Sequence, residues 1–450
     1  MNGVITLDAI RGCFEGLMPA LLASCSPDGT PNITYVSQVH FVDAQHVALT
    51  YQFFNKTRRN VLANPRATVF VGDTTVGTRY LLQLEYRRTE ESGPVFESMK
   101  ARLAGIASHS GMSGVFRLRG ADVYRVLGIE AMPGPTRRPA PRRYPPTSAM
   151  RHVAARIAAA QDVRGLLDDT LAALGEYLDV RHAKVLIHAA EARPPRLYTV
   201  ASLGYAESGV GSEIALGQGV IGVAAEQRVP VRVMHFSSEY TYSRAAREAR
   251  RGDGSGEALE PEIPLPGLAT PGSQLAVPIV LGRRLLGVFY AESEETARFT
   301  HEDEDALLAV AAQLGATLVA LQHAADSADE APVPVAGPGE PRGQPLRIRH
   351  FAANDSVFVG DEYLIKGVAG AILWKLVREQ AGGRRTEFSN RELRLDGSLR
   401  LPEIGDNLEA RLILLARRLE ERTPALRIVK TGRGRFRLDV ARPLELVEVS

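Results

Sequence analysis

Two proline-rich segments divide the chain. Residues 132–149 contain six prolines and four arginines, and residues 323–345 are rich in proline, glycine and acidic residues without apolar periodicity. Proline fixes φ and lacks the backbone donor, so the first segment is expected to be an extended, semi-rigid linker. The second is expected to be disordered. A chain of 450 residues is too long for one ordinary core, so we expect domains at 1–131, 150–322 and 346–450.

The composition is that of a soluble globular protein, with 45% hydrophobic and 24% charged residues. No apolar run approaches the roughly 18–20 residues of a membrane span. The N-terminus lacks the basic and apolar regions of a secretory signal. We therefore expect a cytoplasmic protein without a membrane partner. Cys13 and Cys25 cannot form a disulfide framework or a four-ligand zinc site, so both are expected to be buried apolar groups, and no metal site is predicted.

The N-terminal part predicts short strands joined by tight turns. After an amphipathic pattern at 4–17, strands are expected near 19–26, 32–39 and 46–52, with an Asp28-Gly29 turn between the first two. A basic cluster at 55–59 then opens a short helix, which Asn64-Pro65 ends. Cationic side chains beside the free N–H groups of a helix N-terminus suit a phosphate.

This part resembles the FMN-binding split barrel of the pyridoxamine 5'-phosphate oxidase-like proteins, in its strand order, its basic helix start and its Asn-Pro-Arg ending. The resemblance implies bound FMN and a homodimer with the cofactor at the subunit interface. In that family a Ser-x-Lys at the helix start holds the phosphate, and here Asn55 and Thr57 occupy the aligned positions. The positions that carry over are Tyr51, Gln52, Asn55, Lys56, Thr57 and Arg58. The alternative is a barrel that only dimerises, with its basic side chains solvated.

The middle part opens and closes with amphipathic helix patterns. Glycines at 217, 219 and 222 precede a short helix, but no dinucleotide-binding fingerprint follows. Thr300 and Asp303 form a capping-box pattern. The segments 217–225, 229–233, 276–279, 286–289 and 299–303 resemble a GAF domain. The resemblance implies a six-stranded antiparallel sheet flanked by helices, with a pocket for a small-molecule ligand.

The ligand of this pocket stays open. Residues 150–322 contain no cysteine, which excludes a covalently attached bilin. His182, His188 and His235 are possible haem ligands, although scattered histidines are more often structural, so haem ranks below FMN. The polar insertion at 237–272 is either a lid over the pocket or a surface loop.

The C-terminal part predicts strands near 346–365, helices at 367–380, 389–395 and 408–420, and a hairpin at 426–438. Residues 408–438 hold nine basic and three acidic residues, a charge pattern typical of phosphate-backbone binding. The order resembles the winged-helix effector of response-regulator transcription factors, which implies DNA binding by the third helix and the hairpin wing. The positions that carry over are Arg411, Arg417, Arg418, Lys430, Arg433, Arg435 and Arg437. Alternatively, the arginines pair with Glu409, Glu420 and Glu421, and the domain contacts proteins.

The sequence therefore predicts a multidomain α+β protein with a split β-barrel, a GAF domain and a winged helix-turn-helix. No Ser/His/Asp arrangement, metal-ligand spacing or Walker loop is present, so we name no catalytic residue. We expect a regulator that couples flavin or small-molecule binding to a transcriptional output. The alternative is an FMN-dependent oxidoreductase regulated by its GAF domain, and a third possibility is a scaffolding dimer without a ligand.

Overall fold

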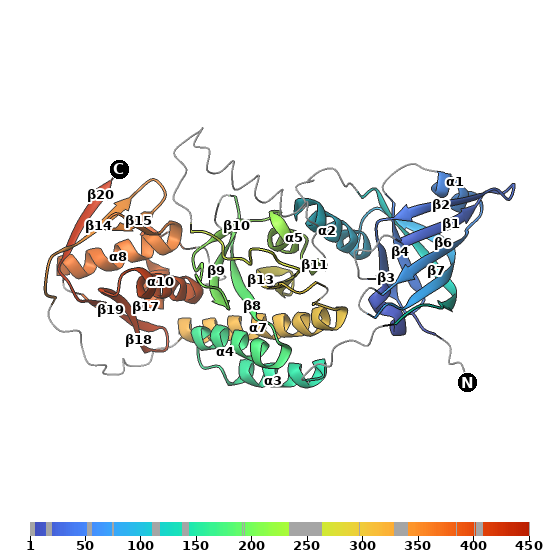
Figure 1. The fold of residues 1–450 in the computed structure, drawn as a ribbon. Helices are drawn as coiled ribbons and strands as arrows, with labels where there is room; N and C mark the ends of the chain where they lie inside the picture. The colour runs from blue at the N-terminus through green and yellow to red at the C-terminus, as the bar shows by residue number, and fades with distance from the viewer. Residues whose placement is uncertain are drawn as a thin grey trace.

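The fold was analysed in a computed structural model of the chain. It describes residues 5–14, 20–51, 56–73, 76–109, 118–136, 144–190, 192, 194–233, 263–296, 298–327, 341–383, 385–399, 401 and 408–449. Figure 1 shows three bodies in a row, with the N-terminal strands at one end, the C-terminal elements at the other, and the second sheet between them.

The N-terminal body is a seven-stranded antiparallel sheet in the order β2-β1-β5-β6-β7-β4-β3. The predicted turn closes the first hairpin, where Gly29 has a φ of +85° that a side chain would strain. The amphipathic helix predicted at 4–17 differs in the structure, where residues 8–14 form a short 3₁₀ helix with a kink at Ile10. The elements are η1 (Asp8–Phe14), β1 (Ala20–Cys25), β2 (Pro31–Val36), β3 (Val39–Asp43), β4 (His46–Tyr51), α1 (Lys56–Ala63), β5 (Arg66–Gly72), β6 (Arg79–Glu90), α2 (Pro94–His109) and β7 (Gly120–Met132).

The middle body is a six-stranded antiparallel sheet in the order β10-β9-β8-β13-β12-β11, which confirms the predicted strand count and pairing. The helix α3 begins at Pro146, where a proline in the first turn costs no intrahelical hydrogen bond. The elements are α3 (Pro146–Ala159), α4 (Val163–Leu178), β8 (His182–Ala189), β9 (Arg196–Leu203), β10 (Glu213–Ala215), α5 (Gly219–Gln227), β11 (Val231–Val233), β12 (Ser273–Leu281), β13 (Arg284–Ser293) and α7 (His301–Ser327).

Both faces of this sheet are covered. The helices α3, α4 and α7 lie on one face and α5 lies on the other (Figure 1). Residues 285–292 of β13 are consequently all buried, whereas a half-exposed strand would alternate. The central strands are therefore fixed by apolar packing on two sides.

The helix α7 is 27 residues long. Residues 301–326 are apolar and long enough to cross a membrane by length and composition alone, a stretch that the sequence interpretation had not counted. In the structure α7 packs against β12, α3 and α4, as the core helix of a globular domain does. Its start touches the N-terminal body through an ion pair between Arg11 and Asp305 (2.8 Å), and its end touches the C-terminal body through Arg394 and Asp326 (2.8 Å).

The C-terminal body has two sheets around three α-helices. A four-stranded sheet in the order β16-β15-β14-β20 includes a parallel β14–β20 pair that the sequence pattern did not predict. A three-stranded sheet follows the order β17-β19-β18. The elements are β14 (Leu346–Phe351), β15 (Ser356–Val359), β16 (Glu362–Ile365), α8 (Gly367–Gly383), β17 (Glu387–Ser389), α9 (Asn390–Leu395), η2 (Gly397–Leu399), α10 (Leu408–Arg422), β18 (Leu426–Gly432), β19 (Arg435–Val440) and β20 (Leu444–Val449).

The two cysteines lie in the N-terminal body. Cys13 is buried, and burial raises the pKa of its thiol to about 12. Cys25 is half-buried at the end of β1. A buried thiol with a raised pKa is unreactive at neutral pH, so Cys13 acts as a small apolar group, as the sequence predicts.

The predicted capping box starts α7. The backbone N–H of Thr300 donates to Oδ2 of Asp303 (2.7 Å), and the N–H of Asp303 donates to Oγ1 of Thr300 (3.4 Å). Each bond satisfies a backbone donor that the helix itself leaves without a partner.

Thr300→Ala should lower the stability of the middle body by about 1 kcal/mol, because one of these donors loses its acceptor. Thr300→Ser is the control, since it keeps the hydroxyl. Thermal unfolding followed by circular dichroism measures the change. Equal midpoints for the alanine and serine variants would contradict the capping role.

Candidate functional site

The barrel site is built around Arg58 in the first turn of α1. Its Nη1 lies 2.6 Å from Oδ1 of Asp122 on β7, and its Nη2 donates to Oγ1 of Thr89 on β6 (3.2 Å). The guanidinium carbon lies 3.9 Å from the ring centroid of Tyr51, in cation–π geometry. Arg58 is thus held by an anion inside the barrel and is not presented as a free phosphate ligand.

The neighbours of Arg58 differ in accessibility. The hydroxyl of Thr57 is buried and accepts a hydrogen bond from the amide of Asn32 on β2 (2.7 Å). Lys56 is exposed at the first position of α1. The predicted residues Gln52 and Asn55 lie outside the described residues. Of the six predicted cofactor residues, the structure therefore brings Tyr51, Thr57 and Arg58 together and places Lys56 beside them.

A cavity adjoins this group. It is lined by side chains from β1, β2, β4, α1 and β7, among them Leu22, Thr34, Tyr35, Ser37, Leu49, Thr50, Tyr51, Thr57, Arg58, Asp122 and Tyr124. Its wall combines aromatic rings with hydroxyls, and the N–H groups of the first turn of α1 lack intrahelical partners. The chemistry of this wall fits a ligand with a planar ring, and the start of α1 beside it suits a phosphate.

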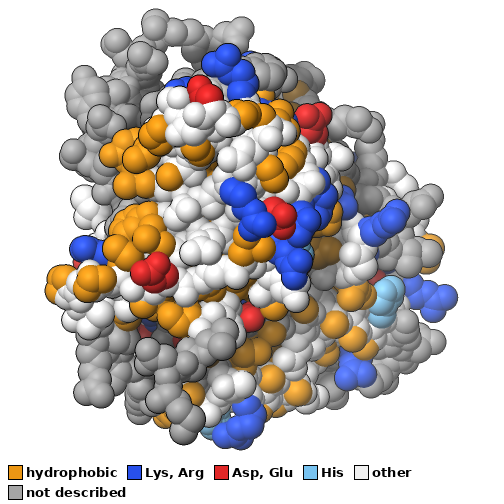
Figure 2. Space-filling model, turned by 90° about the vertical axis from the view of Figure 1, so that its right-hand side faces the viewer, with side chains coloured by type: hydrophobic (Ala, Val, Ile, Leu, Met, Phe, Trp, Pro, Cys, Tyr) orange, Lys and Arg blue, Asp and Glu red, His pale blue; other side chains and the backbone are white. Residues whose placement is uncertain are grey.

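Near this cavity the barrel exposes several large apolar side chains. Ile33 and Tyr35 on the edge strand β2 are 69% and 75% exposed, and Leu62 on α1 is 57% exposed. Figure 2 faces this end of the molecule and shows apolar side chains at the surface between groups of charged ones.

A second site lies inside the middle body and is built from residues that the sequence interpretation had not named. Lys184 on β8 and Glu292 on β13 are 1% and 2% exposed, and their charged atoms are 4.0 Å apart. Tyr205 and Tyr290 donate hydroxyl hydrogen bonds to the Glu292 carboxylate (2.7 and 3.1 Å). The ammonium of Lys184 also lies 4.6 and 4.9 Å from the centroids of these two rings.

The segment 263–268 closes over this cluster. Lys184 donates to the carbonyl of Pro266, and the N–H of Leu268 donates to Glu292 (3.2 Å). Burial lowers the pKa of Lys184 to about 8, and the carboxylate of Glu292 opposes this shift only in part. The signal in the sequence was a lysine within the mainly apolar strand 182–189. Its register partner on β13 is Tyr290, and Glu292 follows two residues later, on the same face of the sheet.

The candidate haem ligands do not converge. His182 and His188 stand at opposite ends of β8, about 20 Å apart at the rise of an extended strand. The His182 ring lies 5.5 Å from that of Tyr205, and His188 lines a cavity between the middle and C-terminal bodies. His235 lies outside the described residues. Among the described residues, no group of three or more His, Cys, Asp and Glu side chains has metal-binding geometry.

The structure places the seven predicted nucleic-acid residues in three settings. Arg418 and Arg437 are buried and bond within their own body, to the carbonyl of Leu364 (3.1 Å) and to Asp439 (2.5 Å). Arg418 also lies close to the middle body, since a Cβ on Gly211 would be 3.5 Å from its Cδ. Arg411, Arg417 and Lys430 lie at the boundary with the middle body. Arg433 is exposed, and Arg435 is half-buried.

The predicted acid partners are only partly used within α10. Glu421 pairs with Arg418 (3.4 Å), whereas Glu420 pairs with Arg164 of the middle body (2.9 Å), and Glu409 accepts from Asn390 (2.6 Å). The alternative predicted that the arginines of α10 pair with acids along one solvated face of that helix. Among the pairs of these three acids, it holds for Arg418–Glu421. The other contacts of these acids reach outside α10.

Two protein-family models match parts of the chain. The pyridoxamine 5'-phosphate oxidase model matches residues 6–127, and the GAF domain model matches residues 162–318. The chain thus carries an N-terminal pyridoxamine 5'-phosphate oxidase-like, split-barrel-like domain followed by a GAF domain, as the sequence predicts. A comparison with curated proteins gave no match.

Solved structures similar to parts of the chain include three distinct kinds of protein. The GAF domain of an Acinetobacter phosphoenolpyruvate-protein phosphotransferase is 20% identical and covers 41% of this chain and 97% of its own (TM-score 0.31). An FMN-binding protein from Syntrophomonas wolfei is 13% identical and covers 28% and 82% (TM-score 0.22). The free methionine-R-sulfoxide reductase of Neisseria meningitidis is 20% identical and covers 38% and 87% (TM-score 0.29). At these TM-scores the likenesses carry no further conclusion.

The buried lysine gives a testable pH dependence. The unfolded chain releases this proton near pH 10.5 and the folded chain near pH 8, so in between the unfolded state binds more protons. The free energy of unfolding therefore rises with pH in that window. Relative to Lys184→Met, the wild type should gain about 1.5 kcal/mol between pH 8 and about pH 9.5, below the ordinary tyrosine range.

Thermal unfolding across this pH range measures the difference. Lys100→Met, which removes an exposed lysine on α2, serves as the control and should follow the wild type. Parallel curves for the wild type and Lys184→Met would contradict a depressed pKa.

Proposed function

We propose that the chain is a sensory regulator in which the GAF domain couples a ligand-binding barrel to a DNA-binding output domain. The observation that carries this proposal is the central position of the GAF domain, which contacts both neighbours. Arg11 reaches Asp305 at the start of α7, and Arg394 reaches Asp326 at its end. The helix α2 of the barrel also packs against α5 and β11. A single domain thus touches the proposed input and the proposed output.

The barrel is proposed to bind FMN. The family match and the cavity beside α1 support this, with Lys56 and the helix start as the phosphate ligands and Tyr51 as an aromatic wall. Flavin would supply redox chemistry to the site. Arg58 would orient Tyr51 through their contact, while Asp122 holds Arg58 in place. The exposed apolar side chains of β2 and α1 support a homodimer whose interface adjoins the cavity.

The GAF domain is proposed to bind a small polar ligand beside the Lys184–Glu292 cluster. Buried charges of both signs suit a ligand that carries donors and acceptors, because each unpaired buried charge is costly. The segment 263–268 would have to yield part of its contacts, since it supplies the carbonyl and the N–H that now satisfy the pair.

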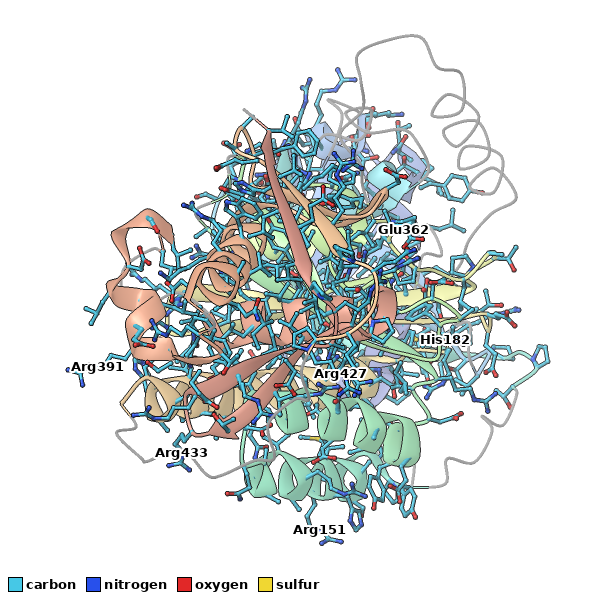
Figure 3. The ribbon with its side chains drawn as sticks, turned by 90° about the vertical axis from the view of Figure 1, so that its left-hand side faces the viewer. Arg151, His182, Glu362, Arg391, Arg427 and Arg433 are labelled. Carbon is cyan, nitrogen blue, oxygen red and sulfur yellow. The ribbon has the colours of Figure 1, made fainter. Side chains whose placement is uncertain are left out.

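The C-terminal body is proposed to be a winged helix that binds DNA. Its order supports this: α8, β17, α9, α10 and then the β18–β19 hairpin, with β17 completing the small sheet. In this reading α10 is the recognition helix and the hairpin is the wing. Arg391 on α9 and Arg433 in the hairpin turn project outward from this end of the molecule (Figure 3).

A second candidate function is an FMN-dependent oxidoreductase regulated by its GAF domain. The family match and the Arg58–Asp122 pair that lines the cavity favour it. The two functions differ in their output: the enzyme turns over a substrate when flavin is bound, whereas the regulator changes its affinity for DNA.

Full-length protein should take up FMN, seen as flavin absorbance and quenched flavin fluorescence on titration. Lys56→Ala should weaken binding about tenfold, since it removes a charge-assisted hydrogen bond to the phosphate. Arg59→Ala is the control, because Arg59 is an exposed cation in the same helix turns. Absence of FMN uptake, or equal losses in both variants, would contradict the proposed cofactor site.

Full-length protein should bind a mixed-sequence DNA duplex with an affinity that falls steeply with salt. Arg433→Ala and Arg391→Ala should each reduce the slope of log affinity against log salt by about 1. Fluorescence anisotropy at several salt concentrations measures these slopes. Arg347→Ala on β14 is the control, since it removes an exposed arginine of the same body. Salt slopes unchanged by Arg433→Ala would contradict a phosphate contact at the wing.

A further inference from the structure

The helix α10 is covered on all sides in its central part, over residues 412–416. Residues 412–416 are buried without interruption, which is more than the 3.6 residues of one helical turn. A surface helix normally buries only one stripe. Here α10 packs against α8 and β16 of its own body and against α4 and β9 of the GAF domain. The second set of contacts covers the face that would otherwise point to solvent.

Charged side chains join α10 to the GAF domain. Arg417 donates to the carbonyl of Val200 on β9 (2.8 Å) and to Asp168 on α4 (2.5 Å). Arg164 and Glu420 form a two-pronged pair, with both N···O distances at 2.9 Å. These pairs fix the position of α10 along α4.

The hairpin, the last residue of α10 and the segment before α8 make further pairs of the same kind. Lys430 on β18 reaches Asp162 (3.1 Å), Lys366 reaches Glu213 (3.6 Å), and Arg422 reaches Glu207 (3.9 Å). Burial opposes ionisation of Asp162, but the hydrogen bonds from Gly165 and Lys430 outweigh it and hold the pKa of this carboxyl below its usual value.

The GAF surface thus presents carboxylates to a basic face. Asp162, Asp168, Glu207, Glu213 and Asp326 each meet a Lys or Arg of the C-terminal body, and among the described residues of the two bodies only the Arg164–Glu420 pair has the opposite polarity. The hairpin turn is also held close to the GAF domain, because a Cβ on Gly434 would lie 2.0 Å from the carbonyl of Ala325 on α7. The carboxylates along this surface form ion pairs with the cations that would otherwise contact the phosphates of DNA.

The apolar part of the interface is incompletely packed. A cavity between the two bodies is lined by Ile187, Tyr198, Val200, Ile365, Val368 and Leu414. Wall atoms of a cavity lack neighbours on one side and lose that dispersion energy. Separating the two bodies therefore costs less dispersion energy than separating two halves of a close-packed core would.

We propose that the GAF domain is an intramolecular inhibitor of the output domain, its acidic surface holding α10 and the hairpin in a closed state that excludes DNA. The inference rests on the proposed DNA-binding function. A helix about 10–12 Å across fills a major groove about 12 Å wide, so α10 cannot enter a groove while α4 and β9 lie against it. Any ligand that favours the separated state raises the affinity for DNA by the factor with which it prefers that state.

The experiment changes only the GAF side of the interface in the full-length chain. Asp168→Lys replaces the partner of Arg417 with a like charge. Asp169→Lys is the matched control: it makes the same charge change one residue away on α4, at a position with no described contact to α10. Glu420→Arg, with Arg164→Glu as the restoring second change, tests the neighbouring pair from the other side.

Two measurements are made on each variant. Hydrogen–deuterium exchange of residues 408–422 measures the release of α10, and fluorescence anisotropy with a mixed-sequence duplex in low salt measures affinity. Asp168→Lys should speed exchange in α10 and tighten DNA binding about tenfold relative to Asp169→Lys. Glu420→Arg should act in the same direction, and Arg164→Glu combined with it should restore slow exchange. Glu420 is exposed, so this variant keeps the test valid if Asp168→Lys does not fold.

The outcomes separate this inference from the function on which it rests. Faster exchange with unchanged DNA affinity in a protein that already binds DNA overturns the inhibition alone. Faster exchange without DNA binding in any variant overturns the DNA-binding output and the inhibition with it. Unchanged exchange in both Asp168→Lys and Glu420→Arg overturns the closed state as a regulated contact.

Discussion

The packing of the GAF sheet on both of its faces is the constraint on which the rest of the structure depends. Three helices cover one face and α5 covers the other, so additional elements can attach only at the edges and along the covering helices. The barrel attaches through α2 beside the edge strand β11, and the C-terminal body attaches through α10 beside β9, the strand next to the short edge strand β10. Covering a sheet edge in this way also hides backbone groups that would otherwise pair with another chain. The order of the three bodies follows from this arrangement.

Much of the fold could be predicted from local patterns in the sequence. The alternation and turns of the barrel, the glycines around the start of α5 and the Thr300–Asp303 pattern are short-range signals, and the structure expresses each of them. The β14–β20 pair could not be predicted in this way, because its strands are parallel and lie almost a hundred residues apart. The segment near Ile10 shows the opposite failure: its helical periodicity is real, but tertiary packing bends it into a kinked 3₁₀ helix.

The candidate sites were predictable only as far as residue type reveals a partner. The basic residues of α10 and its hairpin were visible as a charge pattern, but their partners come from α4 and from residues 207–213, which sequence spacing cannot connect to them. Arg58 was chosen as a cation beside a helix start, and Asp122, which neutralises it, lies 64 residues further along the chain. The Lys184–Glu292 cluster was not predicted, because a lysine in an apolar strand reveals no partner until the neighbouring strand is known.

The length of α7 has a mechanical consequence. Asp305 and Asp326 are 21 positions apart on one uninterrupted helix, about 32 Å at 1.5 Å per residue, and each is tied to a different neighbouring body. An α-helix is stiff along its axis, so the two ion pairs connect the neighbouring bodies to opposite ends of one rigid element. If the barrel moves while the Arg11–Asp305 pair stays intact, one of three things must happen. The helix α7 slides against the sheet, α7 bends, or the Arg394–Asp326 pair at its other end moves. The helix α7 therefore resists compression between the two ends of the molecule, independently of what either end binds.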